Sequence, residues 1–249
     1  MRILSLNCQK GYRSEIVTFF ATVCAEETYN FLLLQECTED LIETLQPVLG
    51  KYSLVTASHP ETHKQSLLVI VYKSTWRLLV HELIPMPNLH PRIIQPETFG
   101  ILTAVFEKDD AHIRVGSTHL HPGFRSSVRR AGMQYIKSAL LLPADVPTIF
   151  GGDCNFGLFG ERKNARRILA PEFVPVSYWL PPTLDSRYSE PHPNIINSTA
   201  VWLAKYGISV KLHTDNFFVS RTLTETAKIT CDVLPDRVSD HLPITLSLK

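Results

Sequence analysis

The sequence lacks the features that mark membrane and secreted proteins. No uninterrupted apolar stretch approaches the roughly 18 residues that a transmembrane helix needs. The apolar run after Met1 is too short for a signal peptide. The five cysteines are odd in number and irregularly spaced, so they predict no disulfide framework. We therefore expect a cytoplasmic protein that does not insert into membranes.

The sequence also lacks a strong excess of charge, internal repeats, and the closely spaced Cys and His residues of zinc sites. Its formal net charge is +1, so no global field attracts it to a polyanion. Hydrophobic residues make up 44% of the chain and charged residues 20%, as is usual in soluble globular proteins. No shift in composition marks a boundary within the 249 residues. These features predict a single domain over residues 1–249, and we expect a monomer.

The first fifty residues predict a layered α/β fold. Residues 2–8 alternate between two faces, as a strand does, and residues 31–36 form the continuous apolar run of a strand buried on both faces. Apolar residues at helical spacing follow each strand, over residues 15–27 and 38–49. Alternation of strands and helices is typical of layered α/β folds.

The remainder of the chain predicts mostly short strands. Turn residues at Lys73–Ser74 and Asp109–Asp110 indicate hairpin connections. Residues 171–198 contain six prolines and no clear periodicity, so we expect a loop that carries specificity. The predicted strands cover residues 52–57, 67–73, 76–84, 100–108, 112–119, 146–150, 210–213, 217–220, 229–233 and 242–248, and the predicted helices cover residues 126–142 and 162–169.

Polar residues stand at or beside the ends of most predicted strands. They are Asn7, Glu36, His119, Asp153 with Asn155, Asp215 with Asn216, and Asp240 with His241. Ligands of layered α/β folds bind at the sheet edge to which the strands deliver side chains. Oxygen-rich groups of this kind suit Mg²⁺, with Mn²⁺ as a substitute. The sequence therefore predicts a hard-cation site with acid and base groups beside it.

The stretch from Thr148 to Gly157 presents a carboxylate and an amide directly after a short apolar run. In an extended chain Asp153 and Asn155 project to the same side, where they would suit holding and deprotonating a water molecule. Gly151 and Gly152 allow other backbone or a substrate to approach closely. Taken alone, the stretch is equally consistent with a polar turn after a buried strand.

Six ordered motifs resemble those of the endonuclease/exonuclease/phosphatase superfamily, which has the DNase I-like fold. They are Leu-Asn7, Leu-Leu-Gln-Glu36, Thr-His119-Leu, Gly-Gly-Asp153-Cys-Asn155, Asp215-Asn-Phe-Phe and Ser239-Asp240-His241-Leu-Pro243. Each motif is short, but together they span almost the whole chain. The resemblance implies a four-layered α/β/β/α sandwich, in which two packed, mostly antiparallel β-sheets are flanked by helices. It also implies magnesium-dependent hydrolysis of a phosphate ester.

The resemblance implies a role for each matched residue. Glu36 is expected to be the main metal ligand, with Asn7 and Asp240 as direct or water-mediated ligands. Asp153 is expected to orient and deprotonate the attacking water, and Asn155 to hold that water. The remaining two roles concern the phosphoryl group. His241, partnered by Asp215, resembles the histidine that donates to the phosphoryl oxygens, and His119 resembles a second phosphate-binding or acid group.

The sequence departs from the family pattern in two places. Cys8-Gln9-Lys10 follows the first asparagine where many relatives have an acidic or aromatic residue, which argues against the abasic-site endonuclease branch. Many relatives also have an arginine three residues before a glutamine in the helix after the Thr-His-Leu motif. Here Ala131 stands three residues before Gln134, and the nearby arginines are displaced.

Three functions remain open from the sequence. The leading hypothesis is a nuclease-type phosphodiesterase, an endonuclease or exonuclease, that acts on DNA, RNA or a nucleic-acid adduct. The second is a phosphatase or phosphodiesterase for a phospholipid head group or a small phosphorylated metabolite. The third is a binding module without activity, and the intact polar set argues against it.

Other residues beside the motifs have simpler explanations. Cys8, Cys37 and Cys154 each follow a candidate site residue, and alternation along a strand turns them towards the core, so we expect buried thiols. His121 matches no motif. Two clusters of basic residues follow the His119 and Asp153 motifs and could flank the mouth of the site: Arg125, Arg129 and Arg130, and Arg162, Lys163, Arg166 and Arg167.

Overall fold

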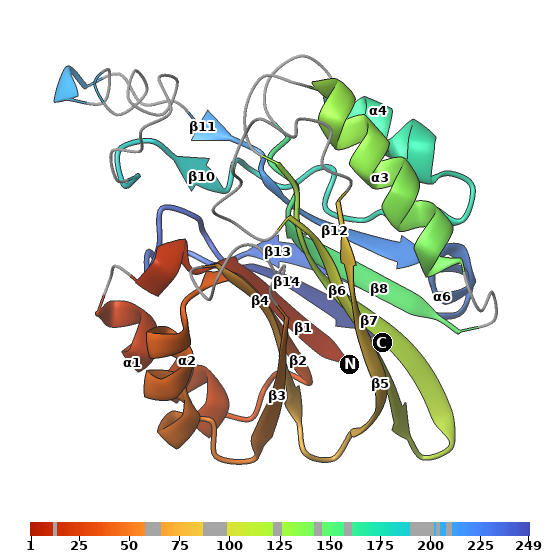
Figure 1. Cartoon of the computed structure of the whole chain (residues 1–249), viewed down its shortest axis with the longest axis horizontal. Helices are drawn as coiled ribbons and strands as arrows, with labels where there is room; N and C mark the ends of the chain where they lie inside the picture. Colours follow the sequence, from red (N-terminus) through yellow and green to blue (C-terminus); the bar gives the residue numbers. More distant parts are fainter. Residues whose placement is uncertain are drawn as a thin grey trace.

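The computed structural model describes residues 1–11, 14–57, 66–86, 99–121, 126–141, 146–156, 161–189, 202, 205–207 and 211–249. In these ranges two six-stranded β-sheets lie at the centre, and helices cover the outer face of each sheet (Figure 1). The four layers confirm the predicted α/β/β/α sandwich. None of the helices in these ranges is long and apolar enough to cross a bilayer.

The first sheet has the strand order β13-β14-β1-β2-β4-β3. Its strands are β1 (Arg2–Asn7), β2 (Phe31–Cys37), β3 (Tyr52–Ala57), β4 (Leu67–Lys73), β13 (Ile229–Val233) and β14 (Ile244–Leu248). β1 and β2 are parallel, and the other neighbouring pairs are antiparallel. A parallel pair needs a long crossover, which α1 (Glu15–Ala25) supplies. The short helix α2 (Glu39–Leu45) follows β2.

The second sheet has the order β5-β6-β7-β8-β12-β9. Its strands are β5 (Arg77–Pro85), β6 (Gly100–Lys108), β7 (Ala111–His119), β8 (Thr148–Asp153), β9 (Phe173–Pro175) and β12 (Asp215–Ser220). β7 and β8 are parallel and are linked through α3 (Ser126–Leu140), while α4 (Glu161–Leu169) follows β8. A separate pair, β10 (Leu184–Asp185) and β11 (Lys211–Leu212), lies outside both sheets, and α6 (Arg221–Thr226) follows β12.

Alternation of side chains along the central strands builds the layers. In β1, Ile3 packs into the core between the sheets, whereas Leu4 packs into the cluster that includes the apolar residues of α1 and α2. In β8, Ile149 belongs to the core between the sheets, and Phe150 packs with α3 and α4. Each sheet is therefore buried on both faces, which explains the continuous apolar runs in the sequence.

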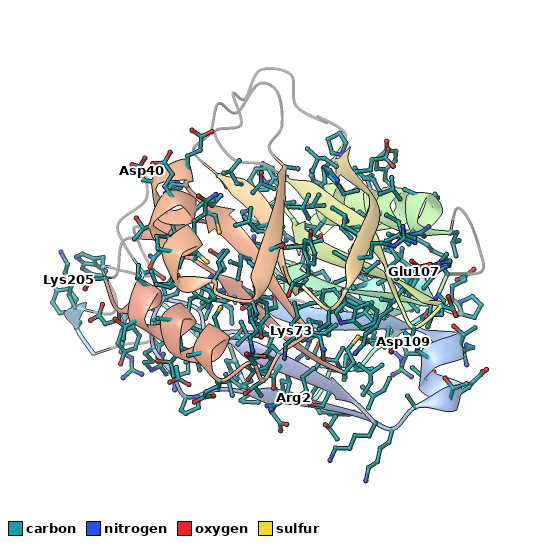
Figure 2. The ribbon with its side chains drawn as sticks, turned by 90° about the horizontal axis from the view of Figure 1, so that it is seen from below. Arg2, Asp40, Lys73, Glu107, Asp109 and Lys205 are labelled. Atoms are coloured by element: carbon teal, nitrogen blue, oxygen red, sulfur yellow. The ribbon has the colours of Figure 1, made fainter. Side chains whose placement is uncertain are left out.

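One of the two predicted hairpins is wrong. β4 pairs within the first sheet and β5 within the second, so the turn after Lys73 crosses from one sheet to the other. Turn residues indicate that the chain reverses, but they carry no information about the next strand's partner. Asp109 and Asp110 do close the β6–β7 hairpin, with φ of 50° and 61°. Both turns lie at the end of the sandwich that Figure 2 faces, where Lys73 and Asp109 are labelled.

The predicted loop at residues 171–198 is loop only in part. β9 and β10 lie within it, and residues 190–198 are outside the described residues. The strand predicted at residues 210–213 is the two-residue β11, and residue 210 is likewise outside the described ranges. The sequence did not predict β9 and β10, because each has too few residues to show periodicity.

A buried ion pair joins the two helices that cover the second sheet. Arg129 of α3 donates from Nη2 to Glu161 Oε1 of α4 at 2.5 Å, and from Nη1 to the His121 carbonyl at 3.1 Å. Both side chains are buried. The sequence left open that Arg129 flanks the mouth of the site, but its guanidinium is enclosed between the helices.

We expect Glu161→Gln to lower the free energy of unfolding by about 3 kcal/mol, because it leaves a buried guanidinium without its counter-charge. Denaturant unfolding followed by circular dichroism measures the change. Glu225→Gln, the same substitution at an exposed position of α6, serves as the control and should change stability by less than about 0.5 kcal/mol. Equal stability of the two variants would contradict the prediction.

Candidate active site

The predicted polar strand ends meet at one end of the sandwich. In the second sheet, Asp153 of β8 pairs with His119 of the parallel β7 on one side and with Asp215 of the antiparallel β12 on the other. In the first sheet, Asn7 of β1 pairs with Gln35 of β2. Parallel strands finish at the same sheet edge, and β12 starts at the edge where β8 finishes. Pairing register therefore explains why residues far apart in sequence converge.

Asp153 lies at the centre of this group and is buried. Its Oδ2 accepts hydrogen bonds from Asn7 Nδ2 at 3.0 Å and from Asn155 Nδ2 at 3.1 Å, and its Oδ1 accepts from the Asn155 backbone N–H at 2.8 Å. The Nε2 atoms of His119 and His241 lie 3.7 Å and 3.9 Å from the same Oδ2. Because Asn7 belongs to the first sheet, Asp153 connects the two halves of the site.

Burial raises the pKa of Asp153, and the charge of Asp215 adds to this effect, while His241 and His119 act against it. A raised pKa makes a carboxylate a stronger base. The raised pKa of Asp153 therefore suits removal of a proton from water.

Glu36 reaches the site through an irregularity that the sequence did not reveal. The pairing of β2 with β4 shifts register between Leu34 and Cys37, and Glu36 has a φ of 51°. A non-glycine residue in this left-handed region costs on the order of 1–3 kcal/mol, and such strain clusters at functional sites. The Glu36 side chain is 18% exposed, with Oε1 3.0 Å from Asn7 Nδ2 and 3.6 Å from His119 Nε2.

Gln35, the residue before Glu36, ties the two sheets together beneath the site. Its side chain is fully buried and donates from Nε2 to Ser117 Oγ of β7 at 3.0 Å. Ser117 Oγ in turn donates to the Leu34 carbonyl at 3.0 Å. In the sequence, Gln35 belongs to the Leu-Leu-Gln-Glu36 motif but has no predicted role, and Ser117 carries no signal of its own.

Gly152 provides the close approach that the sequence predicted for this pair of glycines. It has a φ of 143°, and an added Cβ would lie 2.1 Å from the Thr118 carbonyl oxygen and 2.9 Å from Gln35 Nε2. Any other residue would therefore displace β7 or the cross-sheet tie. Of the two possibilities that the sequence left open, other backbone or a substrate, the close neighbours of Gly152 are other parts of the protein.

His241 and Asp215 form a buried pair, with Nδ1 and Oδ2 2.8 Å apart. Burial alone lowers the pKa of His241, but Asp215, Asp240 and Asp153 outweigh burial and raise that pKa well above its ordinary value. Burial alone raises the pKa of Asp215, and the contact with His241 outweighs it and lowers that pKa. Both shifts favour an imidazolium whose Nε2 is directed towards Asp153 and can act as a donor.

Hydroxyl groups hold this pair in place and were missed by sequence analysis. Thr214 Oγ1 donates to Asp215 Oδ2 at 2.9 Å, and Thr183 Oγ1 accepts from the Asp215 backbone N–H at 3.2 Å. Thr183 comes from the segment that the sequence predicted to be only loop. No periodic pattern marks single hydroxyl residues that act through tertiary contacts.

Asp240 lies beside His241. Its Oδ1 lies 3.9 Å from His241 Nε2 and accepts from Ser239 Oγ at 3.2 Å, while its Oδ2 accepts from Ser189 Oγ at 2.8 Å. Ser189 was not foreseen as part of the site. The role of Asp240 as a metal ligand stays a prediction.

Two groups among the described residues could hold a metal ion. Glu36, His119 and Asp153 form one, and Asp153, Asp215 and His241 form the other, with the ligand atoms of each group within 4.8 Å of one another. The first group, with Asn7 between its two carboxylates, fits a hard divalent cation because carboxylate oxygens predominate. Asn7 currently turns Nδ2 to Glu36 and Asp153, and its Oδ1 accepts from the Gln9 N–H at 3.0 Å. To serve as a ligand, its amide would have to rotate by about half a turn.

The remaining sequence predictions around the site have mixed outcomes. Cys8, Cys37 and Cys154 are buried as predicted, and burial raises the pKa of the Cys8 and Cys154 thiols well above the ordinary value. The His121 ring packs against Phe99 in a tilted arrangement, with ring centroids 4.9 Å apart. Arg125 is outside the described residues.

Neither a protein-family model nor a curated protein matches the sequence. Solved structures do match. TDP2 from D. rerio, complexed with single strand DNA product, has a TM-score of 0.76 at 16% identity, over 100% of this chain and 98% of that chain. A mannosyl-6-phosphatase from Bacteroides thetaiotaomicron has a TM-score of 0.72 at 12% identity, over 100% and 99%.

A third match is an endonuclease/exonuclease/phosphatase family protein, also from Bacteroides thetaiotaomicron, with a TM-score of 0.72 at 13% identity over 100% of this chain and 97% of that chain. At these identities the likeness concerns the fold. The six sequence motifs predict the same fold. This chain therefore shares the fold of these solved structures, a DNase I-like α/β/β/α sandwich.

Proposed function

We propose that this protein is a magnesium-dependent phosphodiesterase that cleaves nucleic acid or a nucleic-acid adduct by direct attack of water on phosphorus. One observation carries the proposal. Asp153 touches the Glu36–Asn7 group on one side and faces the His241–Asp215 pair on the other. A base is thereby placed between a cation site and a charged donor, as in-line hydrolysis of a phosphate ester requires.

The contacts support a role for each residue. Asp153 removes a proton from the attacking water, and Asn155, which is bonded to Asp153 and to the Leu120 carbonyl at 2.7 Å, fixes the position of that water. His241 donates from Nε2 to a phosphoryl oxygen, while Asp215 holds its ring orientation and charge. His119 lies between Glu36 and Asp153 and is placed to bind the phosphate.

Glu36 and Asn7 would hold the magnesium ion, with Asp240 acting through water. When bound, the ion would polarise the phosphoryl oxygen and offset the negative charge that develops on it. The oxygen donors of this group support magnesium over a softer metal.

The choice of nucleic acid is supported by the TDP2 structure, which is a complex with a single strand DNA product. The mannosyl-6-phosphatase of the same fold supports the second candidate, hydrolysis of a small phosphorylated metabolite. The third possibility, an inactive binding module, conflicts with the complete set of acid, base and ligand residues.

The test uses purified protein with bis-nitrophenyl phosphate, a generic phosphodiester. We expect hydrolysis with Mg²⁺, loss of activity with a chelator, and recovery when Mg²⁺ is added back in excess, because the charge of the cation is needed at the phosphoryl group. A parallel panel contains single-stranded DNA, duplex DNA, RNA, phospholipid and sugar phosphates. Nucleic acid should be the preferred substrate. Activity that survives the chelator, or no activity on any ester, would refute the proposal.

Asp215→Asn should move the alkaline limb of the pH–rate profile to lower pH. The charged form of His241 is the donor, and its activity is lost as the pH rises through its pKa. Burial lowers the pKa of His241. Among the carboxylates that raise this pKa, Asp215 has the largest effect. Removing the charge of Asp215 therefore lowers the pKa. The profile of kcat/KM with bis-nitrophenyl phosphate measures the shift, and an unchanged alkaline limb would show that His241 is not the titrating donor.

A further inference from the structure

A short segment from Ser177 to Thr183 is fastened at both ends beside Asp215. Ser177 Oγ accepts from the Phe217 N–H at 2.9 Å and donates to Asn216 Oδ1 at 3.3 Å. At the other end, Thr183 Oγ1 accepts from the Asp215 N–H at 3.2 Å. The five residues between these anchors therefore form a short loop beside Asp215, in which Leu180 packs against the core between the sheets.

This loop carries an exposed tryptophan beside a half-buried tyrosine. Trp179 is 89% exposed, and its ring meets that of Tyr178 edge to face, with centroids 5.0 Å apart. A tryptophan so far outside the core contributes little to folding, and large apolar side chains of this kind mark binding surfaces when they lie next to a site. Trp179 is two residues from Ser177, so its Cα lies within about 7 Å of the Ser177 Cα.

The pair is held in a fixed orientation. Arg162 of α4 places its guanidinium 4.9 Å from the Tyr178 ring centroid and donates from Nη2 to the Ser177 carbonyl at 2.6 Å. The Leu180 N–H bonds to the same carbonyl at 3.1 Å, and Pro181 and Pro182 restrict the backbone that returns to Thr183. A rigid ring with a cation beside it suits a planar, electron-rich group attached to a phosphate.

We infer that Trp179, supported by Tyr178 and Arg162, stacks on an unpaired nucleobase of a single-stranded nucleic acid whose phosphate lies at Asp153. This inference rests on the proposed function and deepens it. Trp179 is a specificity-determining residue that binds the substrate beside the reacting phosphate. Arg162 adds the positive charge that attracts the adjoining phosphate.

Other exposed apolar groups do not share this placement. Val80 lies on β5, the edge strand of the second sheet that is farthest from β12 and β9. Trp202 pairs instead with Tyr206, with ring centroids 4.8 Å apart. Trp202 therefore provides a matched control for Trp179.

The test compares Trp179→Ala, Trp179→Phe and Trp202→Ala on a single-stranded oligonucleotide and on an abasic deoxyribose-phosphate strand of the same length. With Trp179→Ala we expect KM for the oligonucleotide to rise about 10- to 100-fold, the range given by the loss of one stacked base, with a smaller change in kcat. Trp179→Phe should retain most of the affinity. All three variants should cleave the abasic strand as the unmodified protein does.

A second readout does not depend on cleavage. The oligonucleotide, but not the abasic strand, should quench tryptophan fluorescence of the unmodified protein, and this quenching should disappear in Trp179→Phe. If no nucleic acid is cleaved but quenching follows this pattern, the proposed function fails and the stacking site stands. An equal loss for Trp179→Ala on both strands, or quenching that persists in Trp179→Phe, overturns the inference.

Discussion

Asp153→Asn is expected to reduce kcat by about 10²- to 10⁴-fold, the range that removal of a positioned general base produces. An amide cannot accept the proton of the attacking water. The Nδ2 groups of Asn7 and Asn155 donate to Asp153 Oδ2 at 3.0 Å and 3.1 Å. The NH2 group of an asparagine at this position could not accept these hydrogen bonds. Single-turnover rates with bis-nitrophenyl phosphate separate the chemical step from binding.

The control for this substitution is Asp109→Asn at the β6–β7 turn. β7 starts beside Asp109 and ends at His119, so the turn lies at the far end of the sandwich from the site. This variant should keep full activity, and circular dichroism should show both variants folded. A folded Asp153→Asn protein with more than about a tenth of the normal kcat would mean that another group acts as the base.

His241→Gln should lower kcat by about 10²- to 10³-fold, with a smaller change in KM. Its imidazolium is the donor that meets charge developing on the phosphoryl oxygens, and loss of one such donor has an effect of this size. Because Asp215 acts through His241, to which it bonds at 2.8 Å, the double variant with Asp215→Asn should be no slower than His241→Gln alone.

His112→Gln on the exposed start of β7 is the matched control, since it makes the same change away from the site. It should leave kcat unchanged. Fully additive losses for His241→Gln and Asp215→Asn would show that the two residues act separately and would remove the donor pair from the proposed mechanism.

Local patterns in the sequence determined much of the architecture. Alternation around Ile3 and Leu4 assigned opposite faces of β1 to two cores, and the run before Glu36 indicated a strand covered on both sides. The same alternation predicted the buried positions of Cys8, Cys37 and Cys154. These properties repeat every two residues along one strand, so they are visible without knowing which strands are neighbours.

The order of polar strand ends was also visible, because ligands of layered folds collect where strands deliver their side chains. That rule, together with the family resemblance, predicted Asn7, Asp153 and His241 as site residues. It could not give their contacts, since these depend on register between distant strands.

Tertiary structure alone decided the features that join distant segments. The crossing of the chain between sheets after Lys73, the cross-sheet tie through Gln35 and the enclosure of Arg129 by Glu161 each require a partner far away in sequence. The left-handed backbone of Glu36 is of the same kind, because the β2–β4 register shift that creates it depends on two strands together. Periodicity records which way a side chain faces; only the packed sheets determine what that side chain meets.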